Sequence, residues 1–161
     1  MRNKWYALVA AAGLAASGTA LAQGFDIVAG PTATSGARFT SAAFASVFGE
    51  PAADDHFHLA PIASVGWIAP HHTHDENLHH EVFLAGGGVR LLAPDGHWFA
   101  SEELAATSTR TGALSSRFEF MTSGGWQDGH FIVMVRHISN GHIVGGSPNL
   151  GETMLLAGVK F

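Results

Sequence analysis

The chain has 161 residues, of which 47% are hydrophobic and only 13% are charged, and it contains no cysteine. This length allows one domain, and the lack of cysteine excludes disulfide cross-links. The formal net charge of −5 argues against a nucleic acid as the partner.

The N-terminal stretch is typical of a secretory signal peptide. Arg2 and Lys4 precede an apolar stretch, and Ala20-Leu21-Ala22 is a small-x-small cleavage site. A membrane anchor is the alternative, but the apolar stretch is short for a spanning helix and is interrupted by glycine and serine. We therefore expect a signal peptide over residues 1–22 and a folded domain over residues 23–161.

After the signal peptide, short segments of alternating apolar and polar residues are separated by turn-rich breaks, a pattern that predicts an all-β domain. None of these segments is an apolar run long enough to span a bilayer as a helix. A closed β-barrel is the remaining architecture that can cross a membrane. We expect eight strands, at about 24–30, 38–48, 57–69, 80–92, 97–107, 114–123, 130–140 and 152–161.

The connections between these segments alternate in length. Ala93-Pro94-Asp95-Gly96 and Trp126-Gln127-Asp128-Gly129 predict tight turns, whereas the connections 70–79 and 141–151 are long. Bacterial outer-membrane barrels have an even number of strands, short periplasmic turns and longer external loops.

The last segment supports the same architecture, because its apolar row ends at an aromatic residue, Phe161, as in bacterial outer-membrane barrels. An edge strand of a sandwich is the alternative. We predict an eight-stranded antiparallel up-and-down transmembrane β-barrel in the outer membrane of a Gram-negative bacterium. Arg90, Arg117, Glu119 and Arg136 are expected to point inward and to form a buried polar network.

The segment 130–140 carries a histidine and a serine on an otherwise apolar face. In a strand, His137 and Ser139 share that face with Phe131, Val133 and Val135. A base beside a hydroxyl is the minimal unit for nucleophilic catalysis, and a polar residue on a lipid face suggests a functional site. Taken alone, His-x-Ser is a weak signal, because both side chains are harmless at an aqueous interface.

The surrounding residues carry a resemblance to a known family. Arg136-His137-Ile138-Ser139-Asn140, followed by Pro148-Asn149-Leu150-Gly151-Glu152 and a last strand ending at Phe161, resembles the lipid A 3-O-deacylase family (PagL-type, acyloxyacyl hydrolase-like). The likeness is clearest over roughly residues 114–161. It implies that the domain is an eight-stranded outer-membrane barrel. It also implies that the protein is a hydrolase that cleaves the ester-linked acyl chain at position 3 of lipid A.

The resemblance also implies a role for each motif residue. Ser139 would be the nucleophile, His137 the general base and Glu152 the acid that orients His137. Asn140 would help to bind the oxyanion. No metal and no other cofactor is required. The expected partner is lipid A or lipopolysaccharide in the outer leaflet, and the sequence leaves a homodimer open.

Two positions depart from the family pattern. The family usually continues Ser-Asn with Ala-Gly, where this chain has Gly141-His142. Glu152 lies an odd number of positions from Phe161, so a regular strand turns it inward. A one-residue bulge at the start of the last strand would bring it outward. Without the bulge the site is a dyad, or the enzyme is impaired.

The competing interpretation is a non-catalytic small outer-membrane barrel, either structural or metal-binding. It rests on the loop 71–80, which contains five histidines and two carboxylates. Such a composition can bind Zn²⁺, Cu²⁺ or Ni²⁺. The loop lacks a defined ligand spacing such as His-Glu-x-x-His, and a solvated external loop is the simpler interpretation.

Overall fold

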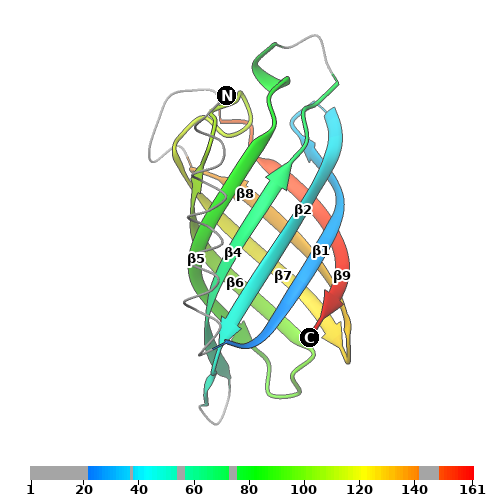
Figure 1. Ribbon diagram of the computed structural model, residues 1–161, viewed down its shortest axis with the longest axis vertical. Helices are drawn as coiled ribbons and strands as arrows, with labels where there is room; N and C mark the ends of the chain where they lie inside the picture. The colour runs from blue at the N-terminus through cyan, green and yellow to red at the C-terminus, as the bar shows by residue number, and fades with distance from the viewer. Residues whose placement is uncertain (1–21, 37, 54–56, 73–75, 142–148) are drawn as a thin grey trace.

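The computed structural model describes residues 22–36, 38–53, 57–72, 76–141 and 149–161. Except for its last residue, the expected signal peptide lies outside these ranges. The described residues form one antiparallel sheet and a single 3₁₀ turn, η1 (Glu76–Leu78) (Figure 1). The strands are β1 (Ala22–Thr34), β2 (Arg38–Gly49), β3 (Ala52–Ala53), β4 (His58–Ile68), β5 (Val82–Leu92), β6 (Trp98–Thr107), β7 (Phe118–Asp128), β8 (Phe131–Ser139) and β9 (Glu152–Lys160).

The sheet closes into a barrel because β2 and β4, the long strands at the two ends of its order, pair with each other. The order is β2-β1-β9-β8-β7-β6-β5-β4, and β2 pairs with β4 from Ala42–Ile68 to Phe48–Ile62. The two-residue strand β3 pairs with β4 alone. The expected eight-stranded antiparallel barrel is therefore confirmed, and closure leaves none of the eight long strands with a free edge. Among the described residues, no helix is both long and apolar enough to span a membrane.

The two ends of the barrel differ. The connections after β1, β4, β6 and β8 lie at the end drawn uppermost in Figure 1, and the C-terminus lies at the lower end. The lower end also holds the tight turn from β7 to β8, in which Asp128 pairs with Phe131. Gly129, the first residue of this two-residue turn, has a φ of 53°, the left-handed conformation that such hairpins require.

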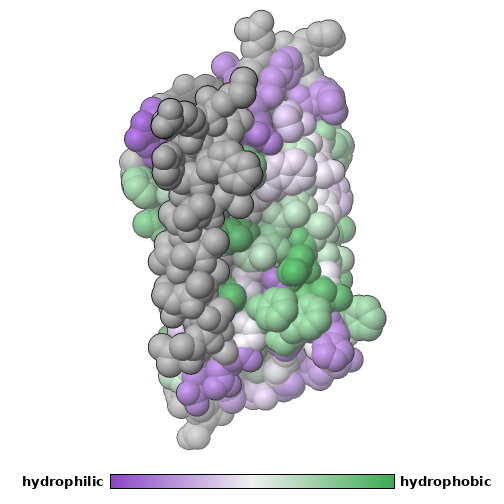
Figure 2. Space-filling model, viewed as in Figure 1, coloured by the Kyte–Doolittle hydropathy of each residue, from purple (hydrophilic) through white to green (hydrophobic). Residues whose placement is uncertain are grey.

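Alternation along each strand separates an apolar outside from a mixed interior. In β8, Phe131, Val133 and Val135 are exposed, whereas Ile132 and Met134 are buried. Figure 2 shows apolar side chains across the middle of one face of the barrel and polar ones toward both ends. Because exposed apolar residues face outward on all eight long strands, the apolar surface surrounds the barrel.

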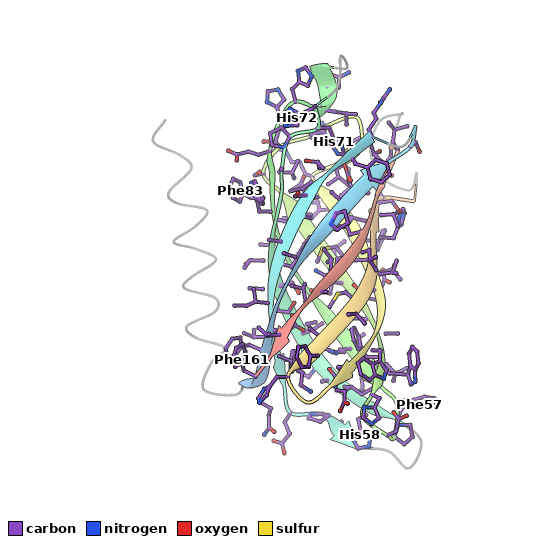
Figure 3. All side chains as sticks on the ribbon, turned by 90° about the vertical axis from the view of Figure 1, so that its right-hand side faces the viewer. Phe57, His58, His71, His72, Phe83 and Phe161 are labelled. Carbon is purple, nitrogen blue, oxygen red and sulfur yellow. The ribbon has the colours of Figure 1, made fainter. Side chains whose placement is uncertain are left out.

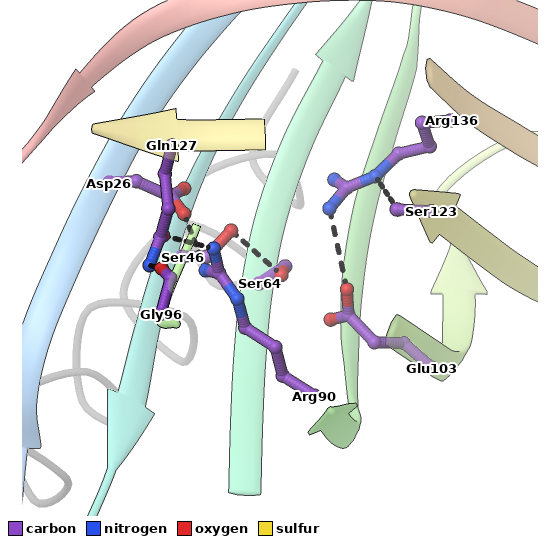
Figure 4. Close-up of polar contacts among 9 residues, drawn as sticks. All are labelled: Asp26, Ser46, Ser64, Arg90, Gly96, Glu103, Ser123, Gln127 and Arg136. Atoms are coloured by element: carbon purple, nitrogen blue, oxygen red, sulfur yellow. Dashed lines mark hydrogen bonds and ion pairs between the residues drawn. The ribbon is translucent and has the colours of Figure 1, made fainter. Parts of the chain in front are cut away.

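The expected inward polar network is confirmed at Arg90 (Figure 4). Its guanidinium donates to Asp26 Oδ2 at 3.1 Å and to Gln127 Oε1 at 2.7 Å. It also lies 3.9 Å from the centroid of the Phe99 ring. Arg90 and Asp26 are each 1% exposed, so this ion pair belongs to the core of the barrel.

A second buried ion pair is centred on Arg136. Its Nε donates to Ser123 Oγ at 2.9 Å, and one of its terminal nitrogens lies 3.4 Å from Glu103 Oε1 (Figure 4). The guanidinium lies 4.4 Å from the centroid of the Phe44 ring. Glu119, as expected, is also fully buried.

The expectation for Arg117 is wrong, because this side chain is exposed. The strand predicted over 114–123 begins only at Phe118. The reason is local: the N–H and the hydroxyl of Ser116 donate to Glu119 Oε1 at 2.9 and 3.0 Å. These bonds hold the chain before Phe118 in a turn, so residues 114–117 do not follow the alternation of β7.

Candidate active site on the outer surface

His137 and Ser139 lie together on the outside of β8, close to the upper end of the barrel. His137 is exposed and Ser139 is half-buried. They continue the outward row that begins with the exposed residues Phe131, Val133 and Val135. The predicted orientation of both side chains, away from the barrel axis, is confirmed.

The ring of His137 is held from the neighbouring strand. Thr153 pairs with His137 in the register of β8 and β9, and His137 Nδ1 lies 2.9 Å from Thr153 Oγ1. When Nδ1 carries the proton and donates it to this hydroxyl, Nε2 keeps a free lone pair. Within the described ranges no hydrogen bond joins His137 to Ser139, which lies two residues further along the same face of β8.

The absence of a side chain at Gly151 leaves room for the His137 ring. A Cβ atom at Gly151 would lie 2.8 Å from His137 Cε1 and 3.3 Å from Nε2. The φ of Gly151 is 68°, a conformation that only glycine adopts readily. Gly151 follows the last register pair, Ile138–Glu152, and is therefore level with Ser139. The ring thus lies against β9, between Thr153 and the residue that is level with Ser139.

The connection between β6 and β7 fixes Gly151 in turn. The N–H of Gly151 donates to the Ala113 carbonyl at 2.9 Å, and the N–H of Leu150 donates to the Gly112 carbonyl at 3.2 Å. Leu114, in the same connection, is fully buried. This connection therefore holds in place Leu150 and Gly151, the second of which lies beside the His137 ring.

Glu152 does not reach His137. The register runs without a bulge through Ile138–Glu152 and His137–Thr153, so Glu152 turns into the barrel and is buried. There its carboxylate lies 2.7 Å from His71 Nε2 and accepts a hydrogen bond of 2.6 Å from Thr32 Oγ1. The bulge that would bring Glu152 outward is absent, and the barrel wall separates it from His137.

Asn140 also points away from the outer surface. It is buried, and its Nδ2 lies 3.3 Å from Ser115 Oγ. Asn149 donates to the same hydroxyl at 3.3 Å and to both carboxylate oxygens of Glu119. The two asparagines of the motif thus connect the chain after β8 to Ser115, and Asn149 also connects it to Glu119 of β7. The Asn140 side chain therefore does not face the outer surface on which Ser139 lies, and its role in binding the oxyanion stays a prediction.

The structure adds residues that the sequence analysis did not select. Glu102 pairs with Thr122, Thr122 with His137, and His137 with Thr153, so these four side chains form one row across the outside of β6 to β9. All four are exposed. Thr122 Oγ1 donates to Glu102 Oε2 at 2.6 Å. The signal was present in the sequence, because Glu102 and Thr122 each interrupt an apolar row, for example Ala100-Glu102-Leu104.

The histidine-rich loop forms no metal site in the part of the chain that the structure describes, where no three His, Asp or Glu side chains could hold an ion together. His71, at the upper end (Figure 3), is buried against Glu152. His72, His79 and His80 are exposed. His74 and Asp75 lie outside the described residues.

Comparison of the chain with protein-family models, with curated proteins and with solved structures found no match. The resemblance to lipid A 3-O-deacylases therefore rests on the motif residues quoted above.

Proposed function

We propose that the chain is an outer-membrane serine esterase that removes the ester-linked 3-position acyl chain of lipid A, with Ser139 as nucleophile and His137 as general base. The observation that carries the proposal is the position of these two residues. They lie on an apolar, outward-facing surface, and the ring of His137 is held by Thr153 beside Gly151, the residue before β9 that is level with Ser139.

The outer surface supports a location in a membrane. Exposed aromatic residues gather near both ends, as in the aromatic girdles of outer-membrane barrels. Phe83 lies near the upper end, and Phe57 and Phe161 lie near the lower end (Figure 3). The Phe161 ring stacks on Phe25 with centroids 4.6 Å apart. With the upper end outside the cell, His137 and Ser139 lie at the level of the outer leaflet.

The proposed reaction uses a dyad. His137 donates Nδ1–H to Thr153 and takes the Ser139 proton on Nε2, while Ser139 Oγ attacks the acyl carbonyl. His137 then returns the proton to the departing sugar oxygen, which leaves an acyl-enzyme. Water, activated by the same imidazole, releases the fatty acid. Because Thr153 is neutral, it orients the ring without the charge stabilisation that a carboxylate would provide.

Mass spectrometry of lipid A from cells that express the chain tests the proposal. We expect lipid A to lose the mass of one 3-hydroxyacyl group with the wild-type chain and to stay intact with Ser139→Ala. Ser41→Ala is the matched control, because Ser41 is an exposed serine on β2. Unchanged lipid A in cells with folded wild-type protein in their outer membrane would overturn the proposal.

A non-catalytic barrel is the second candidate function. The inward position of Glu152 favours it, because the carboxylate expected to orient His137 is bonded to His71 and Thr32 instead. Under this alternative the wild-type chain and Ser139→Ala give identical lipid A, so the same measurement separates the two.

Replacing Gly151 by alanine is expected to lower the rate of deacylation by about 10- to 100-fold, because a displaced catalytic group loses this much. The new methyl group would occupy the space of the His137 ring, 2.8 Å from Cε1. Gly129→Ala is the control: its φ of 53° is similar, but no atom lies within 4 Å of the added carbon. Equal rates in these two variants would contradict the predicted clash between the added methyl group and the His137 ring.

A further inference from the structure

The connection between β6 and β7 forms a pocket at the upper end of the barrel. Its volume is about 430 Å³, and its lining consists of Thr107, Ser108, Thr109, Arg110 and Arg117. These side chains supply two guanidinium groups and three hydroxyls, and none of them is a carboxylate. Such a lining offers hydrogen-bond donors and positive charge, which suits an anion.

The backbone around the pocket is fixed from both sides. The N–H and the hydroxyl of Thr107 donate to the carbonyls of Arg117 and Ser116, each at 2.9 Å. Ser108 donates its N–H to the Phe83 carbonyl at 2.8 Å, and its Oγ accepts the Phe83 N–H at 3.0 Å. The Ser108 hydroxyl can still donate its own proton to a ligand. The pocket therefore has a preformed frame and does not depend on a loop closing.

The two guanidinium groups differ from those inside the barrel. Arg90 and Arg136 are buried and paired with Asp26 and Glu103. Arg110 and Arg117 are exposed, and no carboxylate of the described residues forms an ion pair with either. Two like charges that share one pocket repel each other, and an anion between them removes that repulsion. The planar fork of arginine matches the oxygens of phosphate in particular.

The pocket lies above the apolar outer surface of β7 and β8, which we propose faces lipid. Arg117 directly precedes Phe118, the first residue of β7, and Phe120 pairs with Ser139. Phe118 thus lies about 7 Å further up β7 than the level of Ser139, at about 3.3 Å per residue, and the pocket begins beyond it. A headgroup bound there would hold its acyl chains against the apolar outside of β7 and β8.

We propose that the Arg110–Arg117 pocket binds a phosphate monoester on the sugar headgroup of a glycolipid. The phosphate oxygens accept from both guanidinium groups and from the Ser108 hydroxyl. This binding does not require Ser139 to be catalytic. If the proposed function holds, the bound phosphate positions the sugar so that an ester below it reaches the dyad.

The test measures binding to the full chain with the Ser139→Ala substitution, so that no lipid is consumed. Phosphorylated lipid A and enzymatically dephosphorylated lipid A are titrated by calorimetry in mixed micelles of a neutral detergent. We expect the phosphorylated form to bind at least about tenfold more tightly, in line with charge-assisted hydrogen bonds. Inorganic phosphate is the third probe, and we expect it to compete only weakly because it lacks the lipid.

A double variant assigns the site. Adding Arg110→Gln and Arg117→Gln is expected to abolish the preference for the phosphorylated lipid, whereas Arg38→Gln, at the upper start of β2, retains it. Heat-dependent mobility in gels confirms that each variant is folded. Equal affinity for the two lipids, or a preference that survives the double substitution, would overturn the proposal. Complete displacement of the lipid by millimolar inorganic phosphate would support a phosphate site but overturn its assignment to a headgroup.

Discussion

Replacing His137 by alanine is expected to lower the rate of acyl release by a factor of about 10³ or more, because Ser139 then lacks its base. The measurement is the release of 3-hydroxy fatty acid from lipopolysaccharide by purified protein in detergent micelles. His137 is exposed on the outside of the barrel, so the substitution leaves the core intact. A variant that keeps wild-type activity would remove His137 from the mechanism.

Glu152→Gln is the matched comparison for this variant. The carboxylate faces the interior, where it contacts His71 and Thr32, so we expect a rate within about tenfold of wild type provided that the barrel folds. Thr153→Val removes the hydrogen bond to His137 Nδ1 and is expected to cost about three- to tenfold, the value of one neutral hydrogen bond. A loss with Glu152→Gln as large as that of His137→Ala, in folded protein, would instead favour the family's triad.

The alternation of side chains between the two faces of a strand was the most reliable information in the sequence. It predicted that His137 and Ser139 face outward and that Glu152 faces inward, and the registers of β8 with its two neighbours, β7 and β9, agree on all three. The bulge was suggested by the family resemblance alone, and it is absent. Alternation predicts these orientations correctly because it follows from the backbone of a single strand. A bulge depends on how two strands pair.

Contacts between strands could not be predicted in the same way. Thr153 meets His137, and Thr122 meets Glu102, only because of the registers between neighbouring strands. Register depends on turn geometry and on the packing of a whole face. The late start of β7 was missed for a related reason, because hydrogen bonds from Ser116 to Glu119 interrupt the alternation.

Replacing Glu103 by leucine is expected to lower the free energy of unfolding by about 3–5 kcal/mol, the usual effect of removing one partner from a buried ion pair. Arg136 would keep its charge in the interior, where it is 1% exposed, and would lose the carboxylate at 3.4 Å. Urea unfolding in detergent micelles, followed by tryptophan fluorescence, measures the change.

The double variant Glu103→Leu/Arg136→Met is expected to recover most of this loss. Glu103 Oε2 and one terminal nitrogen of Arg136 are buried without a hydrogen-bond partner among the described residues, so the native pair is incompletely satisfied. Replacing such a pair by apolar side chains of similar volume is often neutral or stabilising. A double variant that is as unstable as Glu103→Leu would contradict this, and would mean that Arg136 stabilises the barrel chiefly through Ser123 and the Phe44 ring.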